Sequence, residues 1–510
     1  MARIPDPPSH PIRCGPFRVT RRGLARAAVL IAVHAIIIFH IIQWKSSGST
    51  LTPVEPSEAA TTIETGFVNT GFLFFAAVIL LTLVFGRFFC GWACHVVAYQ
   101  DFCAWILKKL KIPPMMVRSR LLMIVPFYAA FDMFAWPSLS RLWAGAAPAG
   151  ISDGAGFQGW ALTTPDLWER FPTLGIAILT IAVDGFLIVW WLGSKGFCNY
   201  GCPYGAFFSI ADRFAPGKIR VTDACNGCGH CTAVCTSNVR VHEEVRLYKT
   251  VTDSSCMKCF DCISTCPNDA LFYGFGKPAV ATPKPAAAPK KHYDYTWGGE
   301  IALVILFSIG MFAFRGLYSE VPFLLALGLS SMFAFGTVAF YQLIRNADFR
   351  FQHHSLKLAG KLSGAGWLAI MMMLAGALLT AHSAAVQYYS KSGERLLLTA
   401  QRLQGGERIA ARDESYQHLQ TAEQIGLFPN GKLQFQLASI AFNRGEAGDA
   451  ERRVRLATEY SPRMIDPWLQ LSGIQLSRGD REGARATLER GAAENPGSEL
   501  LKSRLQALAK

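Results

Sequence analysis

Seven apolar stretches, each about long enough to cross a bilayer, constrain this 510-residue chain more than any other feature. A segment inside hydrocarbon must satisfy its backbone N–H and C=O groups internally, so each stretch is expected to form a helix. Only 17% of the residues are charged, which fits a chain with much of its length in lipid. The stretches cover about Leu24–Ile42, Asn69–Phe89, Leu121–Trp136, Leu174–Leu192, Ile301–Tyr318, Val321–Ile344 and Ala365–Tyr388.

Positive charge alternates between the segments that connect these stretches. The tail before the first stretch has five Arg and one acid, and the loop after the second has six Lys and Arg. Because cytoplasmic segments carry the excess of Lys and Arg, the N-terminus is predicted to be cytoplasmic. Seven spans then place the region from about Ser390 on the opposite side. The net charge of +14 is therefore interpreted as a topology signal, with anionic lipid head groups as its counter-charge.

The first stretch is too long and too apolar for the core of a signal peptide, and no small-residue cleavage site follows it. We interpret it as a retained span.

Eight of the 14 Cys form two runs with the same internal spacing. In each run two residues separate the first three Cys, and three residues precede the fourth, which is the spacing of bacterial two-cluster ferredoxins. There, three Cys of one run and the fourth Cys of the other hold one 4Fe–4S cube. The predicted sets are Cys225, Cys228, Cys231 and Cys266 for cluster 1, and Cys256, Cys259, Cys262 and Cys235 for cluster 2.

The alternative for these runs is a pair of zinc sites, which more often use isolated pairs of Cys separated by two residues. Asn226, Gly227 and Gly229 are small or polar, so that backbone N–H groups can approach the cluster sulfurs. One departure is Thr236, where a proline usually follows the fourth Cys, but this residue is not a ligand.

Four further Cys form two pairs in which three residues separate the two Cys. Cys90 and Cys94 lie at the cytoplasmic end of the second predicted span, and Cys198 and Cys202 lie just past that of the fourth. Residues four apart share a helix face, so each pair is expected to present two thiolates in one direction. The four thiolates are candidates for a metal site, a third cluster or a redox-active thiol site. The alternative is buried structural Cys.

Two segments around these pairs, Gly86–Cys94 and Cys198–Ala206, resemble the membrane-bound 4Fe–4S polyferredoxins, the NapH/NosR/CcoG-like family. The resemblance covers roughly residues 65–275. It implies several spans, a cytoplasmic ferredoxin domain, and paired-Cys motifs that take part in electron transfer near the membrane face. Carried over to this chain, the motif residues are Cys90, Cys94, Cys198, Cys202 and the eight ferredoxin Cys. The family usually has proline after the second Cys of each pair, but His95 follows Cys94 and is a candidate metal ligand or proton carrier.

Ionisable residues inside the predicted spans are candidates for a proton or quinone site. They are Asp132 and Asp184 in the third and fourth spans, and His34 and His40 in the first. The alternative is mutual pairing that fixes helix packing. A b-type haem needs two facing His, for which His40 and His382 are the candidate pair. The two remaining Cys, Cys14 and Cys103, are predicted not to be ligands.

The C-terminal region has a repeat of 34 residues. Gly445 and Gly479, Ala450 and Ala484, and Pro462 and Pro496 are each separated by that number. This period and these small, turn-forming residues are typical of tetratricopeptide (TPR) repeats, which bind partners on a concave face. The alternative is an unrelated helical bundle. A stretch rich in Pro, Ala and Lys, Lys277–Lys291, is predicted to be an extended tether.

The predicted fold is a mainly α membrane protein with about seven transmembrane helices, an inserted small α+β two-cluster ferredoxin domain and a C-terminal α-helical TPR-like domain. The expected domains are a first membrane domain, a ferredoxin domain with the second Cys pair, the tether, three further spans and the repeats. Their residues are 1–193, 194–276, 277–298, 299–389 and 390–510.

The predicted function is membrane-anchored iron–sulfur electron transfer. Two 4Fe–4S clusters would exchange electrons with the paired Cys, and from there with quinone, Cu(II) or a redox partner in respiratory-enzyme assembly; soft thiolates favour Cu(I). The alternative is a redox-sensing or maturation scaffold that recruits an assembly client through the repeats. The expected location is the bacterial inner membrane, with the ferredoxin domain cytoplasmic and the repeats periplasmic. Nucleic-acid binding is excluded, because the Lys and Arg lie in short loops beside the spans.

Overall fold

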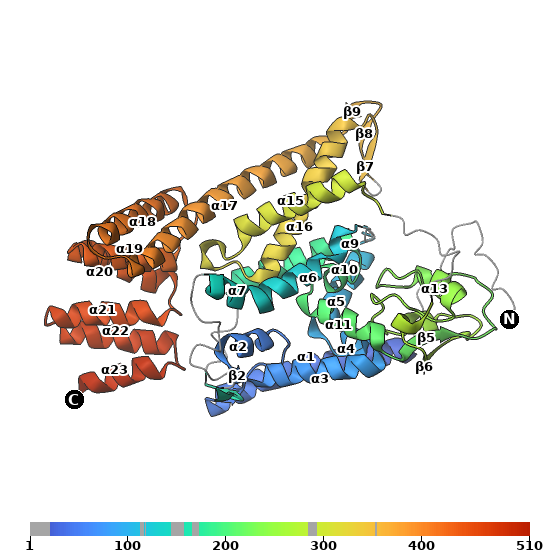
Figure 1. The fold of residues 1–510 in the computed structure, drawn as a ribbon, viewed down its shortest axis with the longest axis horizontal. Helices are drawn as coiled ribbons and strands as arrows, with labels where there is room; N and C mark the ends of the chain where they lie inside the picture. Colours follow the sequence, from blue (N-terminus) through green and yellow to red (C-terminus); the bar gives the residue numbers. More distant parts are fainter. Residues whose placement is uncertain are drawn as a thin grey trace. The chain divides into compact units, whose positions relative to one another are not determined.

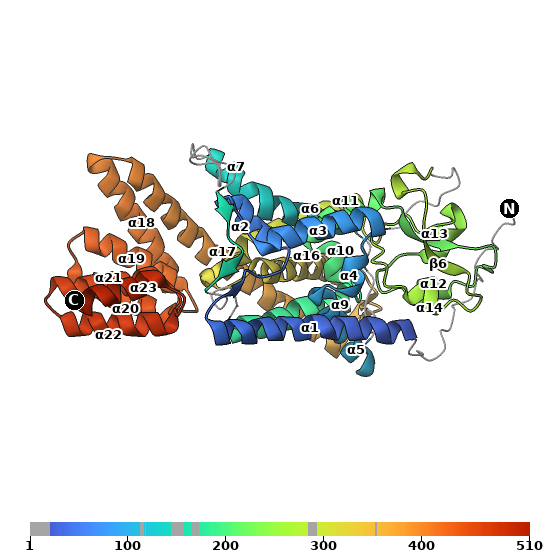
Figure 2. The same cartoon turned by 90° about the horizontal axis from the view of Figure 1, so that it is seen from below.

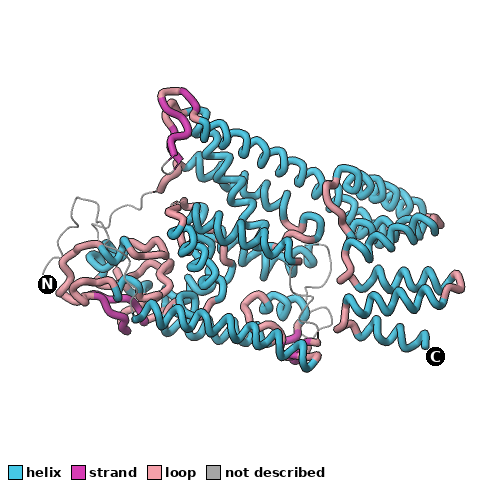
Figure 3. Tube along the Cα trace, turned by 180° about the vertical axis from the view of Figure 1, so that it is seen from behind, coloured by secondary structure: helices cyan, strands magenta, loops and turns pink. Residues whose placement is uncertain are grey.

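The computed structural model describes residues 21–112, 117, 119–143, 158–165, 173–283, 293–351 and 354–509. Helices dominate these residues, and the strands are short (Figure 3). Within this part of the chain, six helices are long and apolar enough to cross a membrane, and one further apolar helix is shorter. The six are Arg21–Ser47, Leu121–Leu139, Leu174–Leu192, Trp297–Phe314, Phe323–Arg345 and Gly364–Arg402. They support a multi-pass membrane protein, whereas the count of seven spans stays a prediction.

The shorter helix, α3 (Thr70–Phe85), replaces the longer second span that the sequence predicts. Its 16 residues rise only about 24 Å, less than the ~30 Å of hydrocarbon in a bilayer. It begins at Asn69, whose side chain accepts a hydrogen bond from the N–H of Phe72. It ends at Gly86, which has a φ of 72° that favours glycine. The apolar residues after Gly86 therefore belong to a separate short helix.

The chain forms two compact units. The first contains Met1–Thr164 and Thr180–Glu300, and the second contains Pro165–Leu179 and Ile301–Lys510. The first unit contains apolar helices and the short helical elements that connect them. They are α1 (Arg21–Ser47), α2 (Glu58–Thr65), α3, α4 (Phe88–Trp92), α5 (His95–Lys109), η1 (Leu121–Met123), α6 (Val125–Ala130), η2 (Phe131–Ala135), α7 (Trp136–Trp143), η4 (Ile181–Leu187), α9 (Ile188–Leu192), α10 (Gly196–Tyr200) and α11 (Pro203–Phe214).

Aromatic packing holds the centre of this unit together. Phe75 of α3 contacts the rings of Phe134, Tyr204, Phe207 and Phe208, which lie on η2 and α11. Helix α1 lies beside α4 and α5 (Figure 2). Two small strand pairs join the connecting segments: β1 (Thr50–Leu51) with β4 (Thr163–Thr164), antiparallel, and β2 (Phe67–Val68) with β3 (Gly159–Trp160), parallel.

The ferredoxin region of the first unit is a small α+β structure. Its first and last strands, β5 (Gly217–Val221) and β6 (Leu271–Phe275), pair in antiparallel fashion with Ile219 opposite Tyr273. Between them lie three short helices, α12 (His230–Ala233), α13 (Val241–Tyr248) and α14 (Asp261–Ser264). Apolar side chains from these elements, such as Ile219, Val245 and Leu271, form a buried core next to the cysteines. The predicted architecture of this region is therefore present.

The second unit holds the remaining apolar helices and the C-terminal hairpins. Helix α17 is continuous over Gly364–Arg402, so that the last predicted span and the start of the repeat region are one helix (Figure 1). It pairs with α18, and a small antiparallel sheet precedes it. The other elements are α15 (Trp297–Phe314), η6 (Leu317–Ser319), α16 (Phe323–Arg345), β7 (Phe349–Phe351), β8 (His354–Leu358), β9 (Lys361–Leu362) and α18 (Gly405–Ile425). Helix α8 (Leu174–Thr180) forms the first part of the fourth apolar stretch. In the first unit, η5 (Ala279–Ala281) follows the ferredoxin region.

The last helices repeat at a spacing of 34 residues. Three helices begin at successive intervals of 34 residues: α19 (Gly431–Asn443), α21 (Ile465–Ser477) and α23 (Glu499–Ala509). The same interval separates the starts of α20 (Ala447–Tyr460) and α22 (Arg481–Glu494). Gly445 and Gly479 turn the two hairpins with φ of 79° and 82°. These helices are hairpins with the predicted period. Their assignment as TPR repeats stays a prediction.

Candidate functional site

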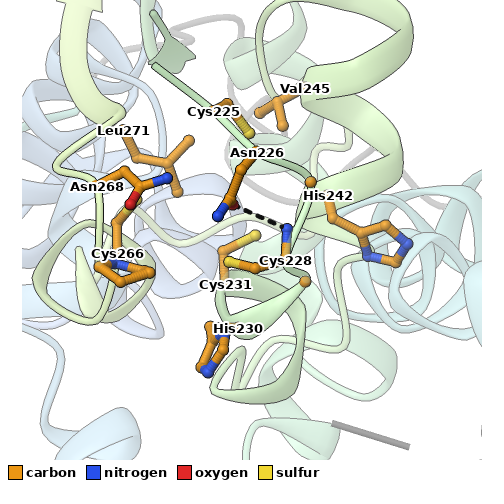
Figure 4. A pocket seen from close by; sticks show the side chains of 13 residues that line it. Cys225, Asn226, Cys228, His230, Cys231, His242, Val245, Cys266, Asn268 and Leu271 are labelled. Atoms are coloured by element: carbon orange, nitrogen blue, oxygen red, sulfur yellow. Dashed lines mark hydrogen bonds between the residues drawn. The ribbon is translucent and has the colours of Figure 1, made fainter. Parts of the chain in front are cut away.

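The first cavity of the ferredoxin region is lined by the cysteines of predicted cluster 1. Cys225, Cys228 and Cys231 come from the first run, and Cys266 reaches it from the end of the second. Their side chains surround a common space (Figure 4). Asn226 accepts a hydrogen bond from the N–H of Cys228 at 3.2 Å, which fixes the loop between the first two cysteines. Among the described residues that line this cavity, none is a Lys or Arg.

A second cavity is lined by the cysteines of predicted cluster 2. Cys256, Cys259 and Cys262 come from the second run, and Cys235 comes from the end of the first. The structure therefore brings the eight cysteines together in two sets that cross between the runs. Lys258 and Asp261 also line this cavity, which makes its surroundings more highly charged than those of the first.

The backbone of both runs is shaped to hold a cluster. Gly227 and Gly229 have φ of 75° and 76°, and the matching residues of the second run, Lys258 and Phe260, have φ of 52° and 67°. Left-handed residues at these places turn successive N–H groups toward the cavity, where they can donate to sulfur. A non-glycine residue in this conformation costs roughly 1–2 kcal/mol, so the surrounding contacts must hold Lys258 and Phe260 in place. The residues present fit two 4Fe–4S clusters.

The paired cysteines do not lie on single helix faces, which corrects the geometry expected from the sequence. Cys90 lies in α4 and Cys94 precedes the first residue of α5, while Cys198 lies in α10 and Cys202 precedes α11. Cys94 and Cys202 are extended, with ψ of 124° and 117°. Pro203 disfavours the helical conformation at Cys202. Cys94 adopts the same conformation before His95, so the missing proline does not change the backbone here.

The four cysteines of the two pairs nevertheless form one group, which we call the tetrad: Cys90, Cys94, Cys198 and Cys202. The Cys198 thiol interacts electrostatically with the other three. Cys90 and Cys198 are buried in one apolar cluster with Phe75 and Phe208. Burial raises the pKa of the Cys202 thiol to about 11, and the neighbouring Cys90 adds to the rise. A metal or cluster that binds here must therefore displace protons.

All thirteen cysteines that the structure describes are free thiols. Among the described residues, no three His, Cys, Asp or Glu side chains converge closely enough to hold a single metal ion. This holds for the tetrad and for the eight ferredoxin cysteines alike. A cube differs from a single ion because it distributes its thiolate ligands over several irons.

The tetrad motifs pack directly against the loops that hold predicted cluster 2. Gly91, next to Cys90, lies so close to the backbone of the second run that an added Cβ would overlap the Met257 carbonyl oxygen. The indole N–H of Trp92 donates to the carbonyl oxygen of Lys258 at 2.9 Å. The side chain of Asn199, next to Cys198, donates to the carbonyl oxygen of Ser237 at 3.1 Å.

Arg87 joins both tetrad motifs and the second run. Its guanidinium donates to the carbonyl oxygens of Ser254 at 3.0 Å and Cys198 at 3.3 Å, and its charge interacts with Cys90. Cluster 2 is therefore the ferredoxin site that adjoins the tetrad.

Three lysines near cluster 2, which sequence reasoning missed, are almost completely buried. They are Lys195, Lys218 and Lys258, and each is at most 1% exposed. Asp212, which is 0% exposed, accepts from the ammonium groups of Lys218 at 2.8 Å and Lys258 at 2.6 Å. These two lysines hold the pKa of Asp212 below its usual range, although burial alone would raise it. One sequence signal was available: Arg87 and Lys195 each stand three residues before the first Cys of a pair.

Replacing Asp212 by alanine is expected to destabilise the protein by about 3–5 kcal/mol, because it leaves two buried ammonium groups without their carboxylate. The measurement is denaturant or thermal unfolding of the detergent-solubilised protein. Glu394→Ala is the control, because its 2.8 Å ion pair with Lys432 is exposed and should contribute only about 0–1 kcal/mol. Equal losses of stability in the two variants would contradict a structural role of the buried ion-paired group of Asp212, Lys218 and Lys258.

His95 lies beside two other titratable residues. Its Nε2 is 4.0 Å from the carboxylate of Glu55, and its charge also interacts with His34 of α1. Burial lowers the pKa of His95, and Glu55 opposes this shift. The structure thus brings together two predicted site residues, His34 and His95, with an acid that the sequence analysis did not select.

The remaining predicted polar residues are dispersed. Asp132 and Asp184 are buried, and each lies in a short π-helical segment, η2 and η4. Such segments often occur at functional sites. His40 Nε2 lies 3.1 Å from the carbonyl oxygen of Leu51. His382 Nε2 lies 2.8 Å from that of Ile425. The proton, quinone and haem roles of these residues stay predictions.

Cys103, predicted not to be a ligand, is buried with Leu107 and Val189 in an apolar cluster. Cys14 and most of the predicted tether lie outside the described residues.

Two segments of the chain match known sequence families. Residues 69–113 and 174–222 match a family described as a 4Fe-4S binding domain, and residues 217–267 match one described as a 4Fe-4S dicluster domain. The first match contains the whole tetrad, and the second contains all eight ferredoxin cysteines. The chain therefore carries ferredoxin-type 4Fe–4S regions, as predicted.

Several curated proteins are similar to part of the chain. The methylamine utilization ferredoxin-type protein MauN of Methylorubrum extorquens is 28% identical over 191 residues, which are 36% of this chain and 60% of MauN. The putative electron transport protein YccM of Escherichia coli is 26% identical over 220 residues, 41% of this chain and 57% of YccM. The ferredoxin-type protein NapH of Haemophilus influenzae is 26% identical over 204 residues, 38% of this chain and 63% of NapH. The chain thus spans about three fifths of the length of these relatives.

Proposed function

We propose that the chain is a membrane-anchored electron-transfer protein in which electrons pass between cluster 1, cluster 2 and a third iron–sulfur cluster held by the tetrad. The observation that carries this proposal is the contact of Gly91, Trp92 and Asn199 with the loops around cluster 2. Electrons that leave the ferredoxin region therefore have the tetrad as their nearest redox-active neighbour.

The choice of a cluster for the tetrad is supported by two observations. The family described as a 4Fe-4S binding domain matches the two segments that contribute the tetrad. Further, the tetrad presents four thiolates and no carboxylate, which suits iron–sulfur ligation. Cys90, Cys94, Cys198 and Cys202 would hold the cluster, which supplies one-electron transfer when bound. Arg87 places a buried positive charge beside these thiolates and bridges them to Ser254.

The acceptor beyond the tetrad would be a redox partner, with a quinone or Cu(II) as two candidates. The group of His95, Glu55 and His34 lies next to Cys94 and suits a reaction in which protons accompany electrons. The predicted orientation places the ferredoxin region in the cytoplasm and the helical hairpins in the periplasm, where they would dock the redox partner or an assembly client.

The test is oxidation of the reduced protein. Dithionite-reduced, desalted protein is mixed anaerobically with a water-soluble quinone or with Cu(II), and the visible absorbance of the clusters is followed. Complete oxidation by one acceptor at a rate that saturates with its concentration is expected. If neither acceptor, nor a membrane extract, oxidises the clusters faster than buffer does, electron transfer is contradicted. The alternative of a redox-sensing scaffold would then be favoured, and a client bound to the full chain would support it.

A further inference from the structure

The three buried lysines differ in how their charge is balanced. Lys218 and Lys258 share the carboxylate of Asp212, as described above. Lys195 is 0% exposed, and its ammonium nitrogen has no hydrogen-bond partner among the described residues. A buried ammonium without a partner is strongly unfavourable, so a counter-charge is expected beside it.

The surroundings of Lys195 indicate where that counter-charge lies. Lys195 lies between two residues that contact the loop around cluster 2: the carbonyl oxygen of Leu192 accepts from the side chain of Asn238 at 3.1 Å, and Asn199 donates to the carbonyl oxygen of Ser237, which lines the cavity of cluster 2. The ammonium charge of Lys195 interacts with Cys259, Asp101 and Asp261. The effect of Cys259 is the largest of the three.

The two carboxylates near Lys195 are engaged elsewhere. Asp101 forms an ion pair with Arg26, and Asp261 lies 4.0 Å from the same guanidinium. Both carboxylate side chains are partly exposed, at 24% and 30%, so water screens them more than it screens Lys195. Arg26 also donates to the carbonyl oxygen of Gly91 at 2.6 Å, which ties this charge group to the tetrad.

We propose that Lys195 is the buried counter-charge of cluster 2 and raises the reduction potential of that cluster. This inference rests on the proposed function. When one electron passes to the group that Cys259 holds, its donor is oxidised by one electron. The donor is cluster 1 or, in the test, dithionite. The negative charge beside Lys195 then increases by one. Lys195 stabilises this charge without forming a bond or transferring a proton, so it is a positioning residue and not a catalytic one.

The consequence is a direction for the electrons. Among the described residues, no Lys or Arg lines the cavity of cluster 1, whereas Lys258 lines that of cluster 2 and the charges of Lys195 and Arg26 act on its ligand Cys259. Buried positive charge stabilises the more negative, reduced state. Cluster 2 is therefore the site that draws electrons from cluster 1 and holds them next to the tetrad.

The test is a redox titration of the full chain in detergent, followed by electron paramagnetic resonance (EPR). Lys195→Gln should lower the equilibrium constant for reduction of one cluster on the order of tenfold. This corresponds to a reduction potential that is lower by about 59 mV for a one-electron couple. Lys195→Arg, which keeps the charge, should restore most of the shift. The same comparison is repeated in a background that lacks cluster 1, the double variant Cys225→Ser with Cys266→Ser. Adding Lys195→Gln to that variant should produce the same shift. The potential of cluster 1 in the otherwise intact chain is the internal control and should not move.

The outcomes separate this inference from the proposed function. Intact clusters whose potentials are unchanged in Lys195→Gln would overturn the role of Lys195 and leave the electron-transfer proposal standing. Absence of reducible clusters from the wild-type protein would overturn both. If Lys195→Gln loses its iron, Lys195→Met, which removes the charge but keeps a long unbranched side chain, is titrated instead, and an unchanged potential of cluster 2 in that variant would equally overturn the inference.

Discussion

Replacing Cys198 and Cys202 by serine should slow the oxidation of the reduced protein by more than about 100-fold. Loss of a residue that merely supports a metal ligand often costs 10–100-fold, and these two residues are proposed as direct ligands. The iron content should fall by about four atoms, while the EPR signals of both ferredoxin clusters persist. Oxidation should slow because, in the proposed path, electrons pass from cluster 2 through the tetrad before they reach an acceptor in the bilayer.

Cys103→Ser is the matched control for this variant. Cys103 is buried, lies nine residues after Cys94 on α5, and packs against Leu107 and Val189 away from the predicted ligand sets. It should keep the iron content and the oxidation rate of the wild type. A double variant at Cys198 and Cys202 that is oxidised at the wild-type rate would remove the tetrad from the electron path.

The second large effect concerns which cysteines share a cluster. The cavities group Cys225 with Cys266, and Cys235 with Cys256, although Cys225 and Cys235 belong to the same run. Replacing Cys225 and Cys266 together by serine should therefore remove one cluster, or about four irons. Replacing Cys225 and Cys235 together should remove two clusters, or about eight irons.

These two double variants have the same number of substitutions, so each is the control for the other. Ligation within each run predicts the opposite result, with the larger loss in the Cys225 and Cys266 variant. Iron and sulfide analysis after anaerobic purification distinguishes the two schemes. Equal losses in both variants would indicate that the ferredoxin region unfolds when any ligand is lost.

The ferredoxin region could be predicted well from the sequence because its information is local. The spacing of the two runs specifies how many cysteines each loop presents, and the crossing follows from the pseudo-symmetric fold that this spacing adopts. The apolar stretches were similarly informative, because a bilayer admits few backbone structures. The period of 34 residues also reappeared in the helix boundaries of α19 to α23.

The geometry of the tetrad could not be predicted in the same way. Spacing of four suggested a shared helix face, but Cys94 and Cys202 lie at breaks between helices. The break after α3 depends on Gly86, whose conformation a hydrophobicity pattern does not reveal. The buried lysines were missed because no local pattern marks them: Lys195 is distant in sequence from Cys259, Lys218 follows Asp212 by six residues in a separate strand, and Lys258 lies inside a ligand run. Their burial results from tertiary packing, since a lysine is otherwise almost always exposed.

The most direct test of the central claim is the metal content of the intact protein. Protein purified anaerobically from membranes is analysed for iron, acid-labile sulfide and copper, and its EPR spins are quantified after reduction. Three clusters predict about twelve irons per chain, with about four of them lost in the variant of Cys198 and Cys202. About eight irons in the wild type, with no loss in that variant, would contradict a third cluster in the tetrad.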